Sequence, residues 1–240
     1  MIQLVFALYL ISAAAPPQAP NDSYLAAVAD AVLRAPDEVS NSLVAIDAKR
    51  SVKVVTWVRA DELDGLKDRR NGAWLRRAPS DIWVTVAPKL KEFCQTFVKS
   101  RFASLEQLML RLEQRLGLPP GSSKSAFVEI VIRDPSRTKN LFRPCANPAV
   151  TTNTCGVDPP ADVIRERHRN WFYRQYYYSF GAAQSDRYPW TGLGYTFDWA
   201  GAEAGQSGFV EQGESEFVIP QGAAIRIESA VGTLDYCSTP

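Results

Sequence analysis

Four cysteines constrain this fold more than any other feature of the sequence: Cys94, Cys145, Cys155 and Cys237. An even number of cysteines in an exported chain predicts a disulfide framework, whose connectivity the count alone leaves open. Cys145 and Cys155 are close neighbours that bracket a turn-rich loop, so we expect them to pair. Cys94 then pairs with Cys237 and ties the C-terminal segment to a central helix. The alternative, a catalytic thiol, requires that one cysteine stays free.

The N-terminus indicates that the chain is exported. Residues 1–15 contain an apolar run from Leu4 to Ile11, followed by small residues and then by a proline-rich stretch, which is the layout of a secretory signal peptide. The run is too short to span a bilayer as a helix, and an uncleaved anchor is the alternative. We therefore expect a signal peptide at 1–15, a flexible linker at 16–22 and a single globular domain at 23–240, secreted or periplasmic. We expect no transmembrane segment after cleavage.

The apolar pattern predicts both helices and strands. Their order shows no strict alternation, so we expect an α+β fold with a mixed or antiparallel sheet and about four helices. The helices are expected at 22–35, 88–102, 105–116 and 160–180, and the strands at 43–46, 52–58, 81–86, 126–132, 215–219 and 223–229; residues 233–237 could add one more strand. The short turn Pro220-Gln221-Gly222 predicts a C-terminal antiparallel β-hairpin.

Charge is unevenly distributed along the chain, although the net charge is only +1. The stretch from Lys49 to Arg143 holds twenty basic and ten acidic residues. Such an excess predicts a basic face for an anionic partner. In an exported protein that partner would be a nucleotide, a phosphoglycan or another anionic envelope component such as lipid headgroups, and not chromosomal nucleic acid. The alternative is that these charges are solvated or face the acidic C-terminal part.

Aromatic residues gather in one segment, since residues 171–199 hold twelve of the 26 in the chain. Rings with a polar tip suit a half-wetted surface and can stack on a sugar or a nucleobase. The candidate ligand-binding residues are Trp171, Tyr188, Trp190, Tyr195 and Trp199. The alternative is that these rings form a core, because Tyr195, Phe197 and Trp199 alternate with polar residues as in a half-buried strand.

Common catalytic motifs are absent from the sequence. His168 is the single histidine, so a histidine-based metal site has too few ligands and we predict no metal. His168 lies at helical spacing from Ile164 and Phe172 and is expected to be a partly buried structural residue. No G-x-S-x-G elbow or phosphate-binding glycine loop is present. Carboxylates that could supply a glycosidase pair are Glu129, Asp186, Asp198, Glu214 and Glu216.

One segment carries a family resemblance. Residues 214–227, ESEFVIPQGAAIRI, resemble the last catalytic strand and hairpin of ADP-ribosyltransferase toxins, and residues 54–59, VVTWVR, look like the early strand of that family, which ends in arginine. The resemblance implies that Glu216 stabilises the oxocarbenium-like ribose of NAD as nicotinamide leaves. It also implies that Glu214 orients the acceptor and that Arg59 holds the NAD phosphates. Segments 112–120 and 188–199 further resemble exported bacterial proteins without an assigned function.

Three functional hypotheses follow from these observations. The first is a disulfide-stabilised binding or interaction protein for an anionic or sugar-like ligand: a small molecule, a glycan or an anionic envelope component. The alternative is an NAD-dependent ADP-ribosyltransferase or NAD glycohydrolase-like toxin, for which NAD is the substrate; no other cofactor is implied. A purely structural envelope protein, which would have no cleft, is a third possibility.

Overall fold

The computed structural model describes residues 20–101, 103–157, 166–181, 187–201 and 211–239. The expected signal peptide at 1–15 lies outside the described residues, as does most of the expected linker. The start of the helix expected at 160–180 also falls outside them. No helix in the described part of the chain is long and apolar enough to cross a bilayer.

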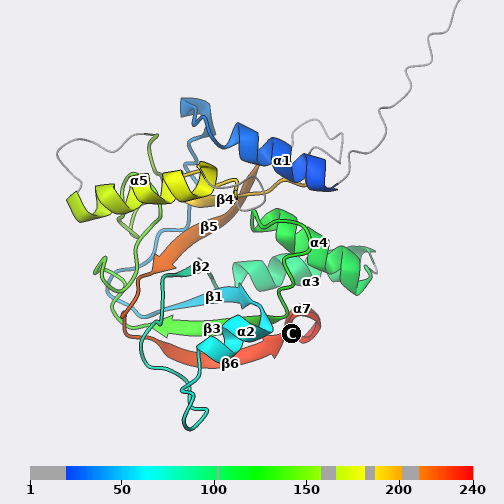
Figure 1. The fold of residues 1–240 in the computed structure, drawn as a ribbon, viewed down its shortest axis with the longest axis vertical. Helices are drawn as coiled ribbons and strands as arrows, with labels where there is room; N and C mark the ends of the chain where they lie inside the picture. The colour runs from blue at the N-terminus through cyan, green and yellow to red at the C-terminus, as the bar shows by residue number, and fades with distance from the viewer. Residues whose placement is uncertain (1–19, 102, 158–165, 182–186, 202–210, 240) are drawn as a thin grey trace, which may run out of the picture.

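The chain forms one α+β domain around an antiparallel sheet of six strands, which confirms the expected fold class (Figure 1). The order across the sheet is β4-β5-β2-β1-β3-β6. The strands are β1 (Val52–Val58), β2 (Ile82–Val86), β3 (Ala126–Ile132), β4 (Tyr195–Phe197), β5 (Gln212–Ile219) and β6 (Arg226–Gly232).

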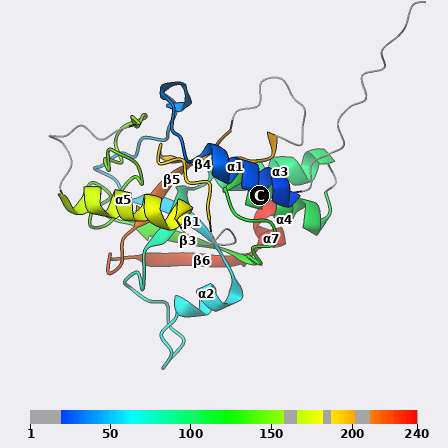
Figure 2. The same ribbon diagram turned by 45° about the horizontal axis from the view of Figure 1, so that its top comes forward.

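The helices lie around this sheet. They are α1 (Pro20–Asp30), α2 (Ala60–Gly65), α3 (Lys89–Arg101), α4 (Leu105–Arg115), α5 (Glu166–Phe180) and α7 (Thr233–Ser238), with a short 3-10 turn η1 (Pro36–Glu38). Figures 1 and 2 show α5 along the outside of the molecule near β5, and α3, α4 and α7 grouped at the opposite end. Helix α4 begins at the expected capping box, in which Ser104 and Gln107 exchange hydrogen bonds between side chain and backbone.

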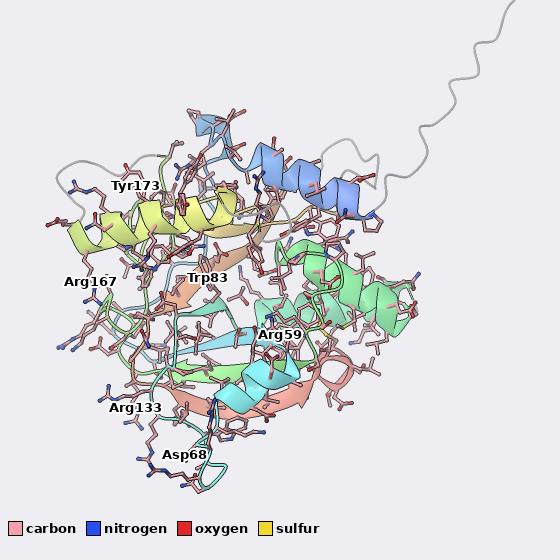
Figure 3. All side chains as sticks on the ribbon, viewed as in Figure 1. Arg59, Asp68, Trp83, Arg133, Arg167 and Tyr173 are labelled. Atoms are coloured by element: carbon pink, nitrogen blue, oxygen red, sulfur yellow. A yellow bond between two sulfur atoms is a disulfide. The ribbon has the colours of Figure 1, made fainter. Side chains whose placement is uncertain are left out.

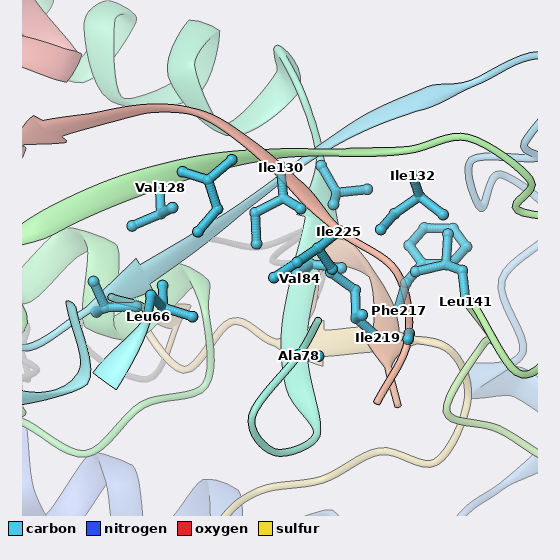
Figure 4. Packing of buried hydrophobic residues seen from close by; sticks show 14 of the residues in the cluster. Leu66, Ala78, Val84, Val128, Ile130, Ile132, Leu141, Phe217, Ile219 and Ile225 are labelled. Carbon is cyan, nitrogen blue, oxygen red and sulfur yellow. The ribbon is translucent and has the colours of Figure 1, made fainter. Parts of the chain in front are cut away.

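Two apolar clusters cover the two faces of the sheet. The first joins side chains from β1, β2, β3, β5 and β6, among them Val84, Ile130 and Phe217 (Figure 4). Because β2, β1 and β3 lie between β5 and β6 and also contribute side chains, this cluster extends across most of one face of the sheet. The second cluster packs Trp57 and Phe127 against α3, α4 and α7.

The sheet splits between its two central strands. β1 and β2 pair only at Val54↔Val86 and Val55↔Thr85. Beyond that point β1 continues along β3 as far as Val58, whereas β2 continues along β5 as far as Ile82. The two halves of the sheet therefore diverge and leave an opening between them.

Both expected disulfides are present, Cys94–Cys237 and Cys145–Cys155. No free cysteine remains, so a catalytic thiol is excluded. The first bridge fastens α7 to α3. The second closes the loop of residues 145–155 against a small core that includes Leu43 and Tyr195.

Several expected elements differ from the structure. Residues 43–46 form no strand, because the N–H groups of Leu43 and Ile46 bond to loop carbonyls at Asn153 and Val150 instead of to a ladder. Residues 233–237 are helix α7 and not a strand; a helical turn lets Tyr236 stack on Phe127 while the neighbouring cysteine forms its bridge. Helix α1 begins inside the expected linker and ends before the expected position.

The expected turn joins β5 to β6, and Gly222 takes a left-handed φ of 81° in it, but the two strands are not neighbours in the sheet. β5 and β6 follow each other directly in the chain. Each strand bonds to other partners in the sheet, β5 to β2 and β4, and β6 to β3. The turn itself is fastened to Ala78, whose carbonyl accepts the Gly222 N–H.

The two disulfides should differ in their contribution to stability. Cys94 and Cys237 are 143 residues apart, whereas Cys145 and Cys155 are 10 apart. Loop-closure entropy predicts that replacing both cysteines of the long bridge by alanine lowers the free energy of unfolding by about 5 kcal/mol, against about 3 kcal/mol for the short bridge. Urea unfolding of the two double variants measures this difference. An equal or reversed order would contradict it.

Candidate functional site

A cavity of about 730 Å³ occupies the split in the sheet. One wall comes from consecutive residues of β1 and the other from consecutive residues of β2, including Trp57 and Val58 on one side and Trp83 and Val84 on the other. Consecutive residues of a strand point to opposite faces of the sheet. The cavity therefore passes between the diverging strands and does not lie on one face.

The split also leaves main-chain groups without a ladder partner. The Ala87 N–H bonds to the Lys53 carbonyl at the closed end of the β1–β2 ladder. Because such bonds recur at alternate residues, the N–H and C=O groups of Trp57 and Trp83 point into the split. They are polar groups that a ligand can pair with in a largely apolar cavity.

Aromatic residues are numerous among those that line the cavity. They are Trp57, Trp83, Tyr188, Trp190, Tyr195 and Phe197. Trp57 is fixed by a 2.8 Å hydrogen bond from its indole N–H to the Thr233 hydroxyl. The indole Nε1 of Trp190 is buried without a hydrogen-bond partner. The lining thus combines aromatic residues with a buried indole N–H that has no partner.

Glu216 is the acidic residue of β5 that lines the cavity. It stands directly across from Thr85 on β2, at the last point where β2 still pairs with β1. Part of its side chain is open to the cavity, whereas Oε2 is shielded from solvent and has no hydrogen-bond partner. The Thr85 hydroxyl is likewise buried and unpartnered. Two polar groups at one register pair of β2 and β5 are therefore buried without a protein partner.

Burial raises the pKa of Glu216 from 4.5 to about 8, although the charge of Arg143 opposes this shift. Arg143 is fully buried and lies over the Phe217 ring. Its guanidinium donates to the carbonyls of Val44 and Thr152 and more distantly to that of Gly194. At neutral pH Glu216 is mainly protonated, because burial outweighs the attraction of Arg143.

Glu214 has a different role although it lies two residues away on the same strand. Its carboxylate accepts a 2.8 Å bond from Arg115 Nε at the end of α4. Arg115 and Arg111 also pair with the buried carboxylate of Asp198, so the four side chains form one ion network. This network fastens α4 to β5 and to the segment after β4. Glu214 is not among the residues that line the cavity.

Arg59 lies at the start of α2, and Figure 3 shows it apart from Trp83. Its guanidinium bonds to Asp61 and Glu62 and is exposed, and it does not line the cavity. The other carboxylate oxygen of Glu62 accepts a 2.8 Å bond from Lys124 Nζ. Glu62 and Lys124 do line the cavity, together with exposed Arg69. Cations therefore gather at the α2 end of the cavity, where a single carboxylate bridges two of them.

The five aromatic candidates fall into two groups. Tyr188, Trp190 and Tyr195 line the cavity. Trp171 lies behind it, where it packs against Trp83 and Trp190 and donates to the Asp81 carboxylate. Trp199 lies in a core cluster with Tyr24 and does not line the cavity.

The remaining chemical candidates lie away from the cavity or outside the described residues. His168 is half-buried and packs on Trp171, and its Nε2 lies 2.9 Å from the Cys145 carbonyl, as a structural histidine would. Glu129 on β3 bonds to Lys53 and Ser229 and is not among the residues that line the cavity. Asp186 lies outside the part of the chain that the structure describes.

A group of acidic side chains could hold a metal ion among the described residues. The carboxylates of Asp30, Glu38 and Glu211 lie within 4.8 Å of one another. Burial and the two neighbouring acids raise the pKa of Glu211. Exposed acidic groups of this kind are common without a metal, so we assign no metal role to it.

Sequence reasoning did not find Thr85, Trp83, Lys124 or Arg143 as site residues. Thr85 and Trp83 belong to an ordinary apolar strand pattern, and only the register against β5 brings them to Glu216. Lys124 is one of many basic residues in its region.

The chain matches no family model, no curated protein and no solved structure in comparisons with known proteins.

The two glutamates of β5 should respond to substitution in opposite ways. Between pH 4.5 and 8 the folded state keeps a proton on Glu216 that the unfolded chain has lost, so this residue lowers the free energy of unfolding as pH rises through that window. The loss is at most about 1.4 kcal/mol per pH unit. Glu216→Gln should therefore remove this fall and be more stable than wild type at pH 9.

Glu214→Gln is the matched control. It should lower the free energy of unfolding at pH 7 by about 2 kcal/mol, because it takes one partner from half-buried Arg115. Chemical denaturation of the three proteins from pH 4 to pH 9 measures both effects. Parallel pH profiles for wild type and Glu216→Gln would contradict the buried, protonated state of Glu216.

Proposed function

We propose that the cavity binds NAD and that the protein cleaves its nicotinamide–ribose bond, passing ADP-ribose to an acceptor or to water. The observation that carries this proposal is the position of Glu216. The residue that the sequence resemblance selects is the glutamate of β5 at the cavity, where its Oε2 has no partner. The two disulfides are compatible with a secreted or periplasmic protein.

The chemistry needs a carboxylate beside a developing cation. The C–N bond between ribose and nicotinamide breaks, and its electron pair stays on the ring nitrogen, so nicotinamide leaves as a neutral molecule. The ribose carbon becomes oxocarbenium-like until an acceptor or water attacks it and loses a proton. An ionised Glu216 stabilises the positive charge on the sugar in this transition state.

The raised pKa of Glu216 fits a cationic substrate. In the free protein the carboxyl is mainly neutral at pH 7, since its pKa is about 8. The nicotinamide ring of NAD is positively charged before the bond breaks. Placing that charge against the carboxyl lowers its pKa, so binding itself favours the ionised form. The site therefore discriminates in favour of the oxidised, cationic form of the dinucleotide.

The walls supply complementary contacts. The rings of half-buried Trp83 and exposed Tyr188 offer flat surfaces for stacking nicotinamide or adenine. The main-chain groups of Trp57 and Trp83 at the split offer a donor and an acceptor for a carboxamide. A mostly apolar cavity with a few converging polar groups is the usual form of a small-molecule site.

The α2 end of the cavity suits the diphosphate. Lys124 and Arg69 line it, and Arg59 stands beside it at the start of α2. The Glu62 carboxylate now bridges Arg59 and Lys124 with contacts of 3.0 and 2.8 Å. A diphosphate carries more negative charge than a carboxylate and competes for the same cations.

A second candidate function uses the same cavity without catalysis. Aromatic walls with cations at one end also suit an anionic or sugar-like ligand that is held and not cleaved. On that reading Glu216 is a hydrogen-bond donor in its protonated form. The two candidates differ in whether nicotinamide is released.

The test is nicotinamide release from NAD by the purified, oxidised protein, followed by chromatography with and without added acceptor protein. Glu216→Gln should lower kcat by about a hundredfold or more, because it removes the charge that stabilises the cationic ribose, while NAD still quenches tryptophan fluorescence. The binding control is Lys124→Met, which should raise KM more than it lowers kcat. If wild type binds NAD without releasing nicotinamide, the non-catalytic candidate replaces the enzyme; absence of both contradicts the proposal.

A further inference from the structure

The outward face of α5 combines arginines with exposed tyrosines. Its exposed basic and aromatic residues are Arg167, Arg169, Tyr173, Arg174, Tyr177 and Tyr178. The three tyrosines are 56%, 65% and 58% exposed. Aromatic side chains of this size are usually at least half-buried, so three on one helix face mark a surface with a partner.

Helical spacing sorts these residues into two rows. Arg169, Tyr173 and Tyr177 follow each other at intervals of four residues along one flank. Arg167, Arg174 and Tyr178 form the other flank, and the rings of Tyr177 and Tyr178 are 6.0 Å apart. Figure 3 shows Arg167 and Tyr173 projecting from different sides of α5. Both flanks therefore carry at least one cation and at least one ring.

The arginines have no protein partner among the described residues. Within the described ranges Arg167, Arg169 and Arg174 form no hydrogen bond, ion pair or ring contact. Glu166 is the one acidic residue within α5, so three arginines against one glutamate leave a charge of +2 on the helix if His168 is neutral. Guanidinium groups that have no partner among the described residues fit the bidentate binding of phosphate oxygens.

We propose that this face of α5 binds a phosphate-bearing glycan chain. Guanidinium groups contact the phosphodiesters, while the tyrosine rings lie against sugar faces and their hydroxyls bond to sugar hydroxyls. Against a purely acidic peptide the tyrosine rings would have no apolar partner and would stay exposed to solvent. A lipid surface would require aliphatic side chains, and the exposed large hydrophobic residues of α5 in the described structure are all tyrosines.

One flank of the α5 surface lies close to the cavity. Trp171 and Gln175 lie next to the Arg167–Arg174–Tyr178 flank on the helix, and Gln175 lines the cavity. A bound glycan chain would therefore run past the cavity on one side. The surface does not depend on the reaction proposed above, since it binds at side chains outside the cavity.

The experiment measures the affinity of the oxidised full-length protein for yeast phosphomannan, with dephosphorylated mannan as the neutral comparison. The variant Arg167→Gln/Arg169→Gln/Arg174→Gln should weaken binding to phosphomannan by roughly tenfold or more. A second variant, with Tyr173, Tyr177 and Tyr178 replaced by alanine, should weaken binding while keeping its salt dependence. The matched control replaces exposed Arg50, Arg70 and Arg133 by glutamine, which changes net charge equally, and should bind like wild type.

Glu216→Gln should also bind phosphomannan like wild type, so a failed NAD reaction and a failed glycan site give different results. If the control variant loses as much affinity for phosphomannan as the α5 variant, net charge alone explains the effect and the proposal is overturned. Absence of binding, equal binding to dephosphorylated mannan, or tighter binding to oligodeoxythymidine or polyglutamate would also overturn it. In the last two cases the face would recognise a nucleic acid or an acidic protein instead.

Discussion

The divergence of β1 and β2 is the constraint on which the rest of this structure depends. β1 is held by seven register pairs with β3, and β2 by four with β5, whereas β1 and β2 share two. The seam between them therefore has the fewest register pairs among the seams that join β5, β2, β1, β3 and β6. Opening it leaves main-chain groups of Trp57 and Trp83 without a ladder, which costs free energy in a buried place. In proteins, unfavourable local features such as unpaired main-chain groups are expected mainly at functional sites.

Two carboxylates of one strand show how burial and pairing decide chemistry. Glu214 meets the Arg115 guanidinium and becomes part of an ion network that fastens α4 to β5. Glu216 lines the cavity, and its Oε2 has no hydrogen-bond partner. Burial raises the pKa of this carboxyl to about 8. One residue therefore serves stability and the other keeps an unsatisfied group, although the sequence presents them as a symmetrical Glu-x-Glu pair.

Local signals in the sequence predicted much of the fold and some of the site. The short loop between Cys145 and Cys155 determined one bridge and, by elimination, the other, and Ser104 with Gln107 marked the start of α4. The split could not be predicted, because it depends on the register of strands that are distant in the chain. For the same reason Thr85 was not recognised, and alternation alone did not separate Tyr195 in the cavity wall from Trp199 in the core.

The central claim is that the split in the sheet is a dinucleotide site with the ribose beside Glu216. A crystal structure of the Glu216→Gln variant with NAD tests this most directly, because the variant should hold the substrate uncleaved. The account predicts electron density for the dinucleotide between β1 and β2, with the nicotinamide ribose next to residue 216 and the diphosphate near Lys124. Density elsewhere on the molecule, or a split filled by side chains with no dinucleotide, would contradict it.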